Sequence, residues 1–97
     1  MNVLITYDVN VTEENGAKRL RRVAKVCVNY GQRVQNSVFE CELTPAMYID
    51  IKEQLLKIID KEKDTIRFYN LGKNWQSRVE KIGRDESYDP RKDTFVI

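Results

Sequence analysis

The order of hydrophobic patterns along the chain predicts a small α+β fold in which two helices cover one face of a four-stranded sheet. Runs rich in β-branched and aromatic residues occur at 2–8, 33–43 and 65–71, with a weaker one at 75–82. Apolar residues at helical spacing occupy about 14–29 and 45–61. If residues 33–43 hold one long strand or a split hairpin, the order is β-α-β-β-α-β, which is the split-βαβ or ferredoxin-like sandwich.

The first strand and helix follow from residue type. Residues 2–8 carry apolar side chains on both alternating faces, which is typical of a central strand covered on two sides. Thr12 is the expected N-cap of the first helix, with Glu13 and Glu14 in its first turn, where the helix dipole favours acids. We expect this helix to end near Gly31.

The second half of the chain has a clear helix start. Thr44-Pro45 combines an N-cap residue with a proline at the first helical position. The apolar stripe that follows predicts a helix that ends near Lys61. Residues 65–71 then form a strand, and Gly72 to Asn74 form a turn.

Composition limits the chemistry of this chain. It has 97 residues, a net charge of +2 and no histidine. A domain of this size has little room for a deep pocket, so a sizeable site must be shallow or shared between copies. Without histidine, catalysis must use carboxylates, hydroxyls, tyrosines or a bound metal. We expect Cys27 and Cys41, each on an apolar stripe, to be reduced core residues.

Targeting signals are missing from the sequence. The chain opens directly on a β-like run, and it contains no apolar run of 18 residues. We therefore expect a cytoplasmic protein with no membrane partner.

The outer face of the first helix is basic. It carries five cations within eight residues, namely Lys18, Arg19, Arg21, Arg22 and Lys25. None has an acid at i+4 to pair with, so the stripe is either a solvated face or a surface that contacts phosphates. Arg33 lies just beyond the helix end. Two-fold symmetry would lengthen the track to suit duplex DNA.

Asp8 ends the first strand, where side chains of different elements converge. An aspartate at such a position often serves as a turn or helix-capping residue. In a dimer whose two-fold axis passes near these strand ends, two Asp8 carboxylates would face each other. Paired carboxylates with backbone carbonyls and water suit Mg²⁺ or Mn²⁺.

The first two strands carry apolar side chains on both faces, which predicts a homodimer. In residues 33–43, Val34 and Val38 lie on the face opposite to Phe39 and Cys41. Two helices cover only one face of the sheet, so the other face is either exposed on a monomer or buried against a second copy. We expect the dimer, with Val34 and Val38 in its interface.

The C-terminal residues form a separate part of the chain. We assign 1–83 to the ferredoxin-like domain and 84–97 to a polar tail that ends in Thr94-Phe95-Val96-Ile97. A terminal apolar segment favours a sheet edge, on its own subunit or on the neighbour. We expect Phe95, Val96 and Ile97 to add a strand to the partner subunit and to join the dimer interface.

Several segments of the sequence resemble the CRISPR-associated Cas-two family. They are Val3 to Val9, the helix Lys18 to Lys25, and Tyr30-Gly31-Gln32-Arg33-Val34-Gln35-Asn36-Ser37-Val38-Phe39-Glu40. Arg67 to Gly72 matches the third strand of the family, so the similarity extends over the whole chain. The most specific part is the run from Gly31 to Glu40 in register with Tyr7-Asp8.

The resemblance implies a homodimeric CRISPR adaptation protein that acts with the CRISPR integrase subunits in spacer acquisition. It also implies an Mg²⁺-dependent endonuclease that cleaves phosphodiester bonds of double-stranded DNA or single-stranded RNA. By the same resemblance, Asp8 is the metal ligand and catalytic residue, and Lys18, Arg19 and Arg22 contact phosphates.

Two interpretations of function remain. In the first, paired Asp8 side chains hold Mg²⁺, or Mn²⁺ in its place, and the metal activates a water for phosphodiester attack. In the second, the chain is a non-catalytic scaffold whose basic tracks hold duplex DNA and whose tail docks an integrase subunit, while Asp8 is structural. One carboxylate per subunit is few for a nuclease, so the scaffold interpretation is kept as the alternative.

Overall fold

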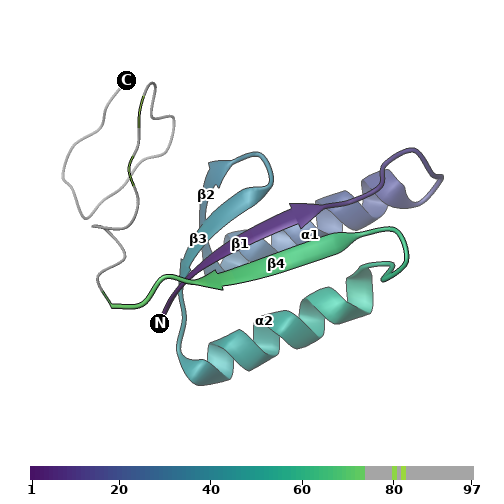
Figure 1. The fold of residues 1–97 in the computed structure, drawn as a ribbon. Helices are drawn as coiled ribbons and strands as arrows, with labels where there is room; N and C mark the ends of the chain where they lie inside the picture. Colours follow the sequence, from purple (N-terminus) through teal and green to yellow (C-terminus); the bar gives the residue numbers. More distant parts are fainter. Residues whose placement is uncertain (74–79, 81, 83–97) are drawn as a thin grey trace.

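The computed structural model describes residues 1–73, 80 and 82 and has the predicted order of elements. They are β1 (Asn2–Asp8), α1 (Gly16–Tyr30), β2 (Gly31–Gln35), β3 (Val38–Glu42), α2 (Pro45–Ile58) and β4 (Thr65–Asn70). The strands form one antiparallel sheet in the order β2-β3-β1-β4, and α1 and α2 lie side by side against it (Figure 1). The predicted ferredoxin-like order β-α-β-β-α-β is therefore confirmed.

The core lies between the helices and one face of the sheet. Side chains alternate along β1, so that Val3, Ile5 and Tyr7 are buried while Leu4 and Thr6 face the other way. The other buried apolar residues are Val9, Val23, Cys27, Phe39, Cys41, Leu43, Ile51 and Leu55. Within the described part of the chain, neither helix has the length and apolar character needed to cross a bilayer.

The region before α1 differs from the prediction. The structure places Asn15, not Thr12, at the N-cap. The backbone N–H and the hydroxyl of Thr12 both donate to Asn10 Oδ1, at 3.0 and 2.6 Å, so Thr12 closes a turn instead of capping a helix. The helix begins only at Gly16, where a Cβ would lie 2.0 Å from the Asn10 carbonyl oxygen. Glycine is therefore required where the loop crosses the start of α1.

Residues 33–43 form a hairpin, not one long strand. β2 begins directly after α1, at Gly31, and Asn36-Ser37 turn the chain into β3. The ladder is irregular between Arg33 and Gln35, so a β-bulge precedes the turn. The hairpin supplies the β2 and β3 strands that the ferredoxin-like order needs.

α2 starts as predicted and ends earlier. The Thr44 hydroxyl accepts a hydrogen bond from the Met47 N–H at 3.1 Å, and Pro45 occupies the first turn. The helix ends at Ile58 instead of near Lys61, because residues 60–64 form a turn of their own. In this turn the Asp64 N–H donates to the Asp60 carbonyl at 2.8 Å.

Cys27 and Cys41 are free and buried, as predicted. Burial raises the pKa of the Cys27 thiol to about 12 and that of the Cys41 thiol to about 11. The predicted strand at 75–82, apart from residues 80 and 82, and the tail at 84–97 with Phe95, Val96 and Ile97 lie outside the described residues.

Candidate functional site

Asp8 is an exposed carboxylate at the end of β1. It alternates with buried Tyr7 and so belongs to the open face of the sheet, the face without helices. Its cross-strand neighbour is Thr65, the first residue of β4. The strand end that the sequence singled out is therefore accessible from solvent.

Among the described residues, one chain supplies only part of a metal site at Asp8. Carboxylate oxygen is a ligand that Mg²⁺ and Mn²⁺ prefer, and Mg²⁺ keeps several waters beside one or two carboxylates. Among residues 1–73, 80 and 82, no group of three or more His, Cys, Asp or Glu side chains could hold a metal ion. Asp8 thus fits as one ligand of such an ion, and the described residues of one chain place no cluster of further ligands around it.

A second aspartate, Asp64, lies just before β4 and is fully enclosed. Its side chain is 0% exposed, and it forms an ion pair with Arg19 at 2.8 Å. Its Oδ1 accepts hydrogen bonds from the Asn10 N–H at 3.0 Å and from Arg19 Nη2 at 3.3 Å. Its Oδ2 accepts from Arg19 Nε at 2.8 Å and from the Asp60 N–H at 2.9 Å. One carboxylate therefore joins the loop after Asp8, helix α1 and the turn before β4.

The charge of Asp64 is stable in this environment. Burial alone would raise the pKa of the carboxyl, but the hydrogen bonds from Arg19 and from the N–H groups of Asp60 and Asn10 outweigh burial. The pKa of Asp64 therefore lies below its ordinary value. The hydrogen bond to Asp64 in turn raises the pKa of Arg19, whose guanidinium stays charged.

Asp64 was missed by the sequence analysis. Asp60-Lys61-Glu62-Lys63-Asp64 has the composition of an exposed polar turn, and nothing in it marks one acid as buried. The one feature that could have marked Asp64 is its position. It directly precedes β4, the strand that pairs with β1 at the Asp8 end.

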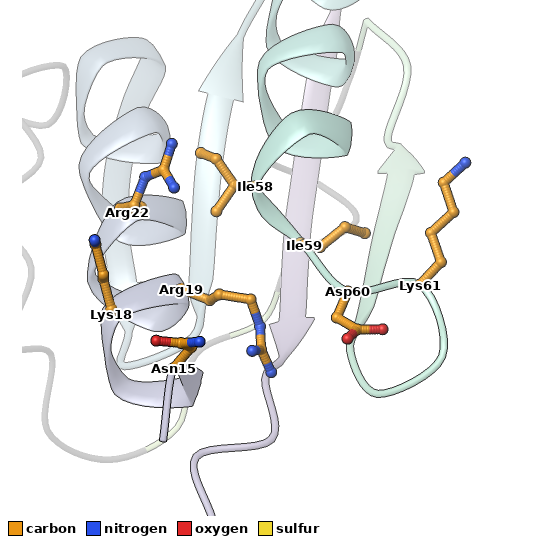
Figure 2. Close-up of a pocket in the computed structure, with 8 residues that line it drawn as sticks. All are labelled: Asn15, Lys18, Arg19, Arg22, Ile58, Ile59, Asp60 and Lys61. Carbon is orange, nitrogen blue, oxygen red and sulfur yellow. The ribbon is translucent and has the colours of Figure 1, made fainter. Parts of the chain in front are cut away.

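The predicted phosphate contacts on α1 lie together, and one of them has an internal partner. Lys18, Arg19 and Arg22 line a depression of about 630 Å³ between α1 and the end of α2, and Lys61 lies on its opposite side. In Figure 2 the side chains of Lys18 and Arg22 point in the opposite direction to that of Arg19. Arg19 is directed to Asp64 and is only 13% exposed. Lys18 and Arg22 are the exposed cations of the predicted set in this basic depression.

The fourth predicted contact, Arg33, lies elsewhere. It is on β2, and its guanidinium lies over the Phe39 ring, 5.1 Å from the ring centre. Tyr7 stacks on the same ring at 6.1 Å and donates a hydrogen bond to the Asn36 carbonyl at 3.2 Å. Burial raises the pKa of the Tyr7 hydroxyl, against a hydrogen bond from Arg33 that lowers it. Arg33 thus packs against the hairpin and is not among the residues that line the basic depression.

The open face of the sheet has mixed polarity. Val38 faces away from the helices, as predicted. Val34 is half-buried and lies at the bulge between Arg33 and Gln35, where the alternation of β2 is interrupted. Leu4 and Tyr69 add apolar surface, and Tyr69 is 43% exposed. Arg67 Nη1 donates to the Tyr69 hydroxyl at 3.4 Å on the same strand. The face is therefore less apolar than the sequence pattern indicated.

Comparison with known proteins agrees with this geometry. The family model for CRISPR associated protein Cas2 matches residues 1–79. The "CRISPR-associated endoribonuclease Cas2" of Nitratidesulfovibrio vulgaris is 54% identical over 90 residues, which are 93% of this chain and 88% of that protein. The "CRISPR-associated endonuclease Cas2" of Halalkalibacterium halodurans is 54% identical over 89 residues, or 92% of this chain and 93% of that one.

Solved structures show the same relationship. The crystal structure of Streptococcus pyogenes Cas2 at pH 6.5 has a TM-score of 0.78 and 66% sequence identity, and the match covers 86% of this chain and 100% of that chain. The family match over most of the sequence, the close relatives and the shared fold lead to one conclusion: this chain belongs to the Cas2 family of CRISPR associated proteins.

Proposed function

We propose that this chain is a divalent-metal-dependent endonuclease of CRISPR adaptation, with Asp8 as its metal ligand and catalytic residue. The observation that carries the proposal is the exposed Asp8 carboxylate at the end of a central strand. Relatives named an endoribonuclease and an endonuclease support cleavage of phosphodiester bonds. Since one name specifies RNA and the other leaves the nucleic acid open, we keep both single-stranded RNA and double-stranded DNA as candidates.

The active form that we propose is a homodimer in which the open faces pack together and bring two Asp8 carboxylates opposite each other. One copy supplies too few ligands among its described residues, and a second copy would supply the missing carboxylate. Val34 and Val38 would lie in the interface, and the terminal Phe95, Val96 and Ile97 would pair with the partner's sheet. A bound Mg²⁺, or Mn²⁺, would lower the pKa of a water and so supply the nucleophile.

The nucleic-acid surface that we propose is centred on Lys18 and Arg22 in the basic depression, with Lys61 across from them. Their exposed cations can contact phosphate oxygens without sequence preference. Arg33, exposed at the β2 edge, would add a contact away from the depression. We leave Arg19 out of this surface, because Asp64 engages its guanidinium.

The test of the endonuclease is cleavage and binding of labelled duplex DNA and single-stranded RNA by the full chain and by Asp8→Ala, with Mg²⁺, Mn²⁺ or a chelator. We expect metal-dependent cleavage that Asp8→Ala abolishes while binding persists. Glu42→Ala is the matched control, since Glu42 is an exposed acid of β3 that pairs with Asn2 at the other end of β1. Equal cleavage by the full chain and Asp8→Ala would exclude Asp8 from catalysis.

A second candidate is a non-catalytic scaffold of the integration complex, with the CRISPR integrase subunits as partners and Asp8 structural. Two observations favour it: one chain holds no complete metal site among its described residues, and Asp8 is not among the residues that line the basic depression. In this case binding would depend on Lys18 and Arg22, and no cleavage would occur with any metal. The same assay therefore separates the two candidates.

A further inference from the structure

The loop that follows Asp8 is held by the buried Asp64–Arg19 pair. Asn10 lies two residues after Asp8, and its N–H donates to Asp64 Oδ1 at 3.0 Å. The carbonyl of the same Asn10 accepts from Arg19 Nη2 at 3.4 Å. Both backbone polar groups of Asn10 are thus engaged by the two members of one ion pair, which are themselves 2.8 Å apart.

Asp8 is also linked to Asp64 through the sheet. Thr65 pairs with Asp8 across the β1–β4 ladder, and Asp64 is the residue before Thr65. Asp64 is therefore joined to the Asp8 segment by two routes, the strand pairing and the Asn10 hydrogen bond. The strand pairing and the hydrogen bond therefore connect Asp64 to residues on both sides of Val9, at the end of β1.

Two further features hold the loop in one path. Val9, between Asp8 and Asn10, is buried in the core at 7% exposure. On the other side, Gly16 lets the loop pass so close that a Cβ would lie 2.7 Å from Val11 Cα. The loop is therefore anchored by Val9, by the Asn10 hydrogen bonds and by close packing on α1.

We propose that Asp64 is the positioning residue for Asp8, holding the residue 9–12 loop so that the Asp8 carboxylate is presented in one fixed place at the strand end. The proposal rests on the proposed function, because it concerns how Asp8 meets a metal and a substrate. Strand ends open locally at low free-energy cost unless tertiary contacts hold them. A ligand that must meet a second carboxylate needs a fixed position, and a supporting residue is the usual means.

The position of the pair argues for this role over simple stabilisation. A buried ion pair is often no more stabilising than an apolar pair of similar size, and fixing one arrangement is a better supported use. Both partners of this pair bond to the residue two positions beyond Asp8. A pair that only joined α1 to the turn before β4 would not need to contact Asn10.

The test uses the full-length protein and three changes. Asp64→Asn keeps the shape but places an amide where one charged oxygen meets Arg19. The double change Arg19→Met with Asp64→Leu replaces the pair by apolar side chains, which preserves the fold if the pair is not needed for stability. Lys63→Met is the control, because Lys63 lies in the same turn and pairs with Glu13 and Asp60 without contacting Asn10.

Two measurements do not need cleavage. Amide hydrogen exchange should accelerate at Asn10 in Asp64→Asn and in the double variant, with Ile5 of the core unchanged. Titration with Mn²⁺ alone should broaden the Asp8 amide signal in the unmodified protein and in Lys63→Met, and should need more Mn²⁺ in both Asp64 variants. Unchanged Asn10 exchange or unchanged Mn²⁺ titration in the Asp64 variants would overturn the inference.

Kinetics supply the third measurement, taken well below the melting temperature of each variant. We expect kcat to fall about 10- to 100-fold in Asp64→Asn, with KM for the nucleic acid unchanged. A double variant that melts like the unmodified protein and has lost kcat would separate positioning from stability, whereas full activity in it would refute the inference. Equal cleavage by the unmodified protein and Asp8→Ala would instead refute the proposed function, and the Mn²⁺ and exchange results would still decide the role of Asp64.

Discussion

Asp8 and Asp64 lie at the same end of two paired strands, and their carboxylates have opposite environments. Asp8 is exposed on the open face, whereas Asp64 is fully enclosed and accepts hydrogen bonds from Arg19, Asn10 and Asp60. The proposed roles follow this difference: Asp8 is directed outward, where a metal could reach it, and Asp64 is directed inward, where it bonds to the loop at Asn10. Arg19 and Arg22 on α1 differ in the same way: Arg19 is directed inward to Asp64, and Arg22 is exposed in the basic depression.

The largest expected effect is on stability. Asp64→Ala leaves the Arg19 guanidinium largely buried without its counter-charge, which should lower the free energy of unfolding by about 3–5 kcal/mol. Urea unfolding measures this change. Lys63→Met, which removes exposed ion pairs of the same turn, should change the free energy of unfolding far less. Similar losses of unfolding free energy in Asp64→Ala and Lys63→Met would mean that the buried Asp64–Arg19 pair matters no more to stability than the exposed pairs of Lys63.

The second expected effect is on the pH dependence of stability. The folded-state pKa of Asp64 lies below its ordinary value of 3.8, so its contribution is fully present above that pH and is lost as the pH falls through the folded-state pKa. Urea midpoints measured from neutral pH down into this acidic range should fall for the unmodified protein. The urea midpoint of Asp64→Asn should fall less steeply with decreasing pH. An equal pH dependence in the two proteins would contradict a lowered pKa of Asp64 as the cause.

The comparison of Arg22 with Arg19 predicts a smaller effect, on binding. Arg22→Ala should weaken binding of duplex DNA and reduce the slope of log K against log salt by about 1, which is the loss of one phosphate contact. Its melting temperature should stay unchanged, because Arg22 is exposed. Arg19→Ala should show the reverse pattern, with a lower melting temperature and the salt slope retained. A reduced slope of log K against log salt in Arg19→Ala would indicate that Arg19 does contact phosphates on the nucleic-acid surface.

Asp8 should also contribute little to stability. Asp8→Asn should change the free energy of unfolding by no more than about 0.5 kcal/mol, since surface substitutions away from buried networks are nearly neutral. The same variant should lose metal-dependent cleavage. A clear loss of stability in Asp8→Asn would indicate that Asp8 is a structural residue, as the scaffold interpretation holds.

Much of the fold could be predicted because its signals are local. The β-branched and aromatic run of β1 and the Thr44-Pro45 start of α2 depend on neighbouring residues, and the central strand and the helix start are both confirmed. The hairpin at Asn36-Ser37 was left open, because apolar residues continue on both sides of it. The Thr12 cap was wrong, since the N–H and hydroxyl of Thr12 both donate to the Asn10 side chain and the helix begins only at Gly16.

The candidate site was predictable to a lesser extent. Asp8 stands out because it ends a hydrophobic strand, and the clustered cations of α1 stand out by number. The partner of Arg19, however, lies 45 residues away in sequence. Residue types alone group Arg19 with Lys18 and Arg22. Only the packing of α1 beside the turn before β4 shows that Arg19 is the cation with a buried partner.

The two buried thiols have a practical consequence. The thiolate is the form that reacts with alkylating reagents, and the pKa values of about 12 and 11 keep Cys27 and Cys41 protonated near neutral pH. A single cysteine introduced on the open face, as in Glu42→Cys, should therefore take up a maleimide spin label while the native thiols stay unmodified. If the protein forms the proposed homodimer, spin–spin distances between two labelled copies would then give the separation of their sheets directly, without first removing either native cysteine.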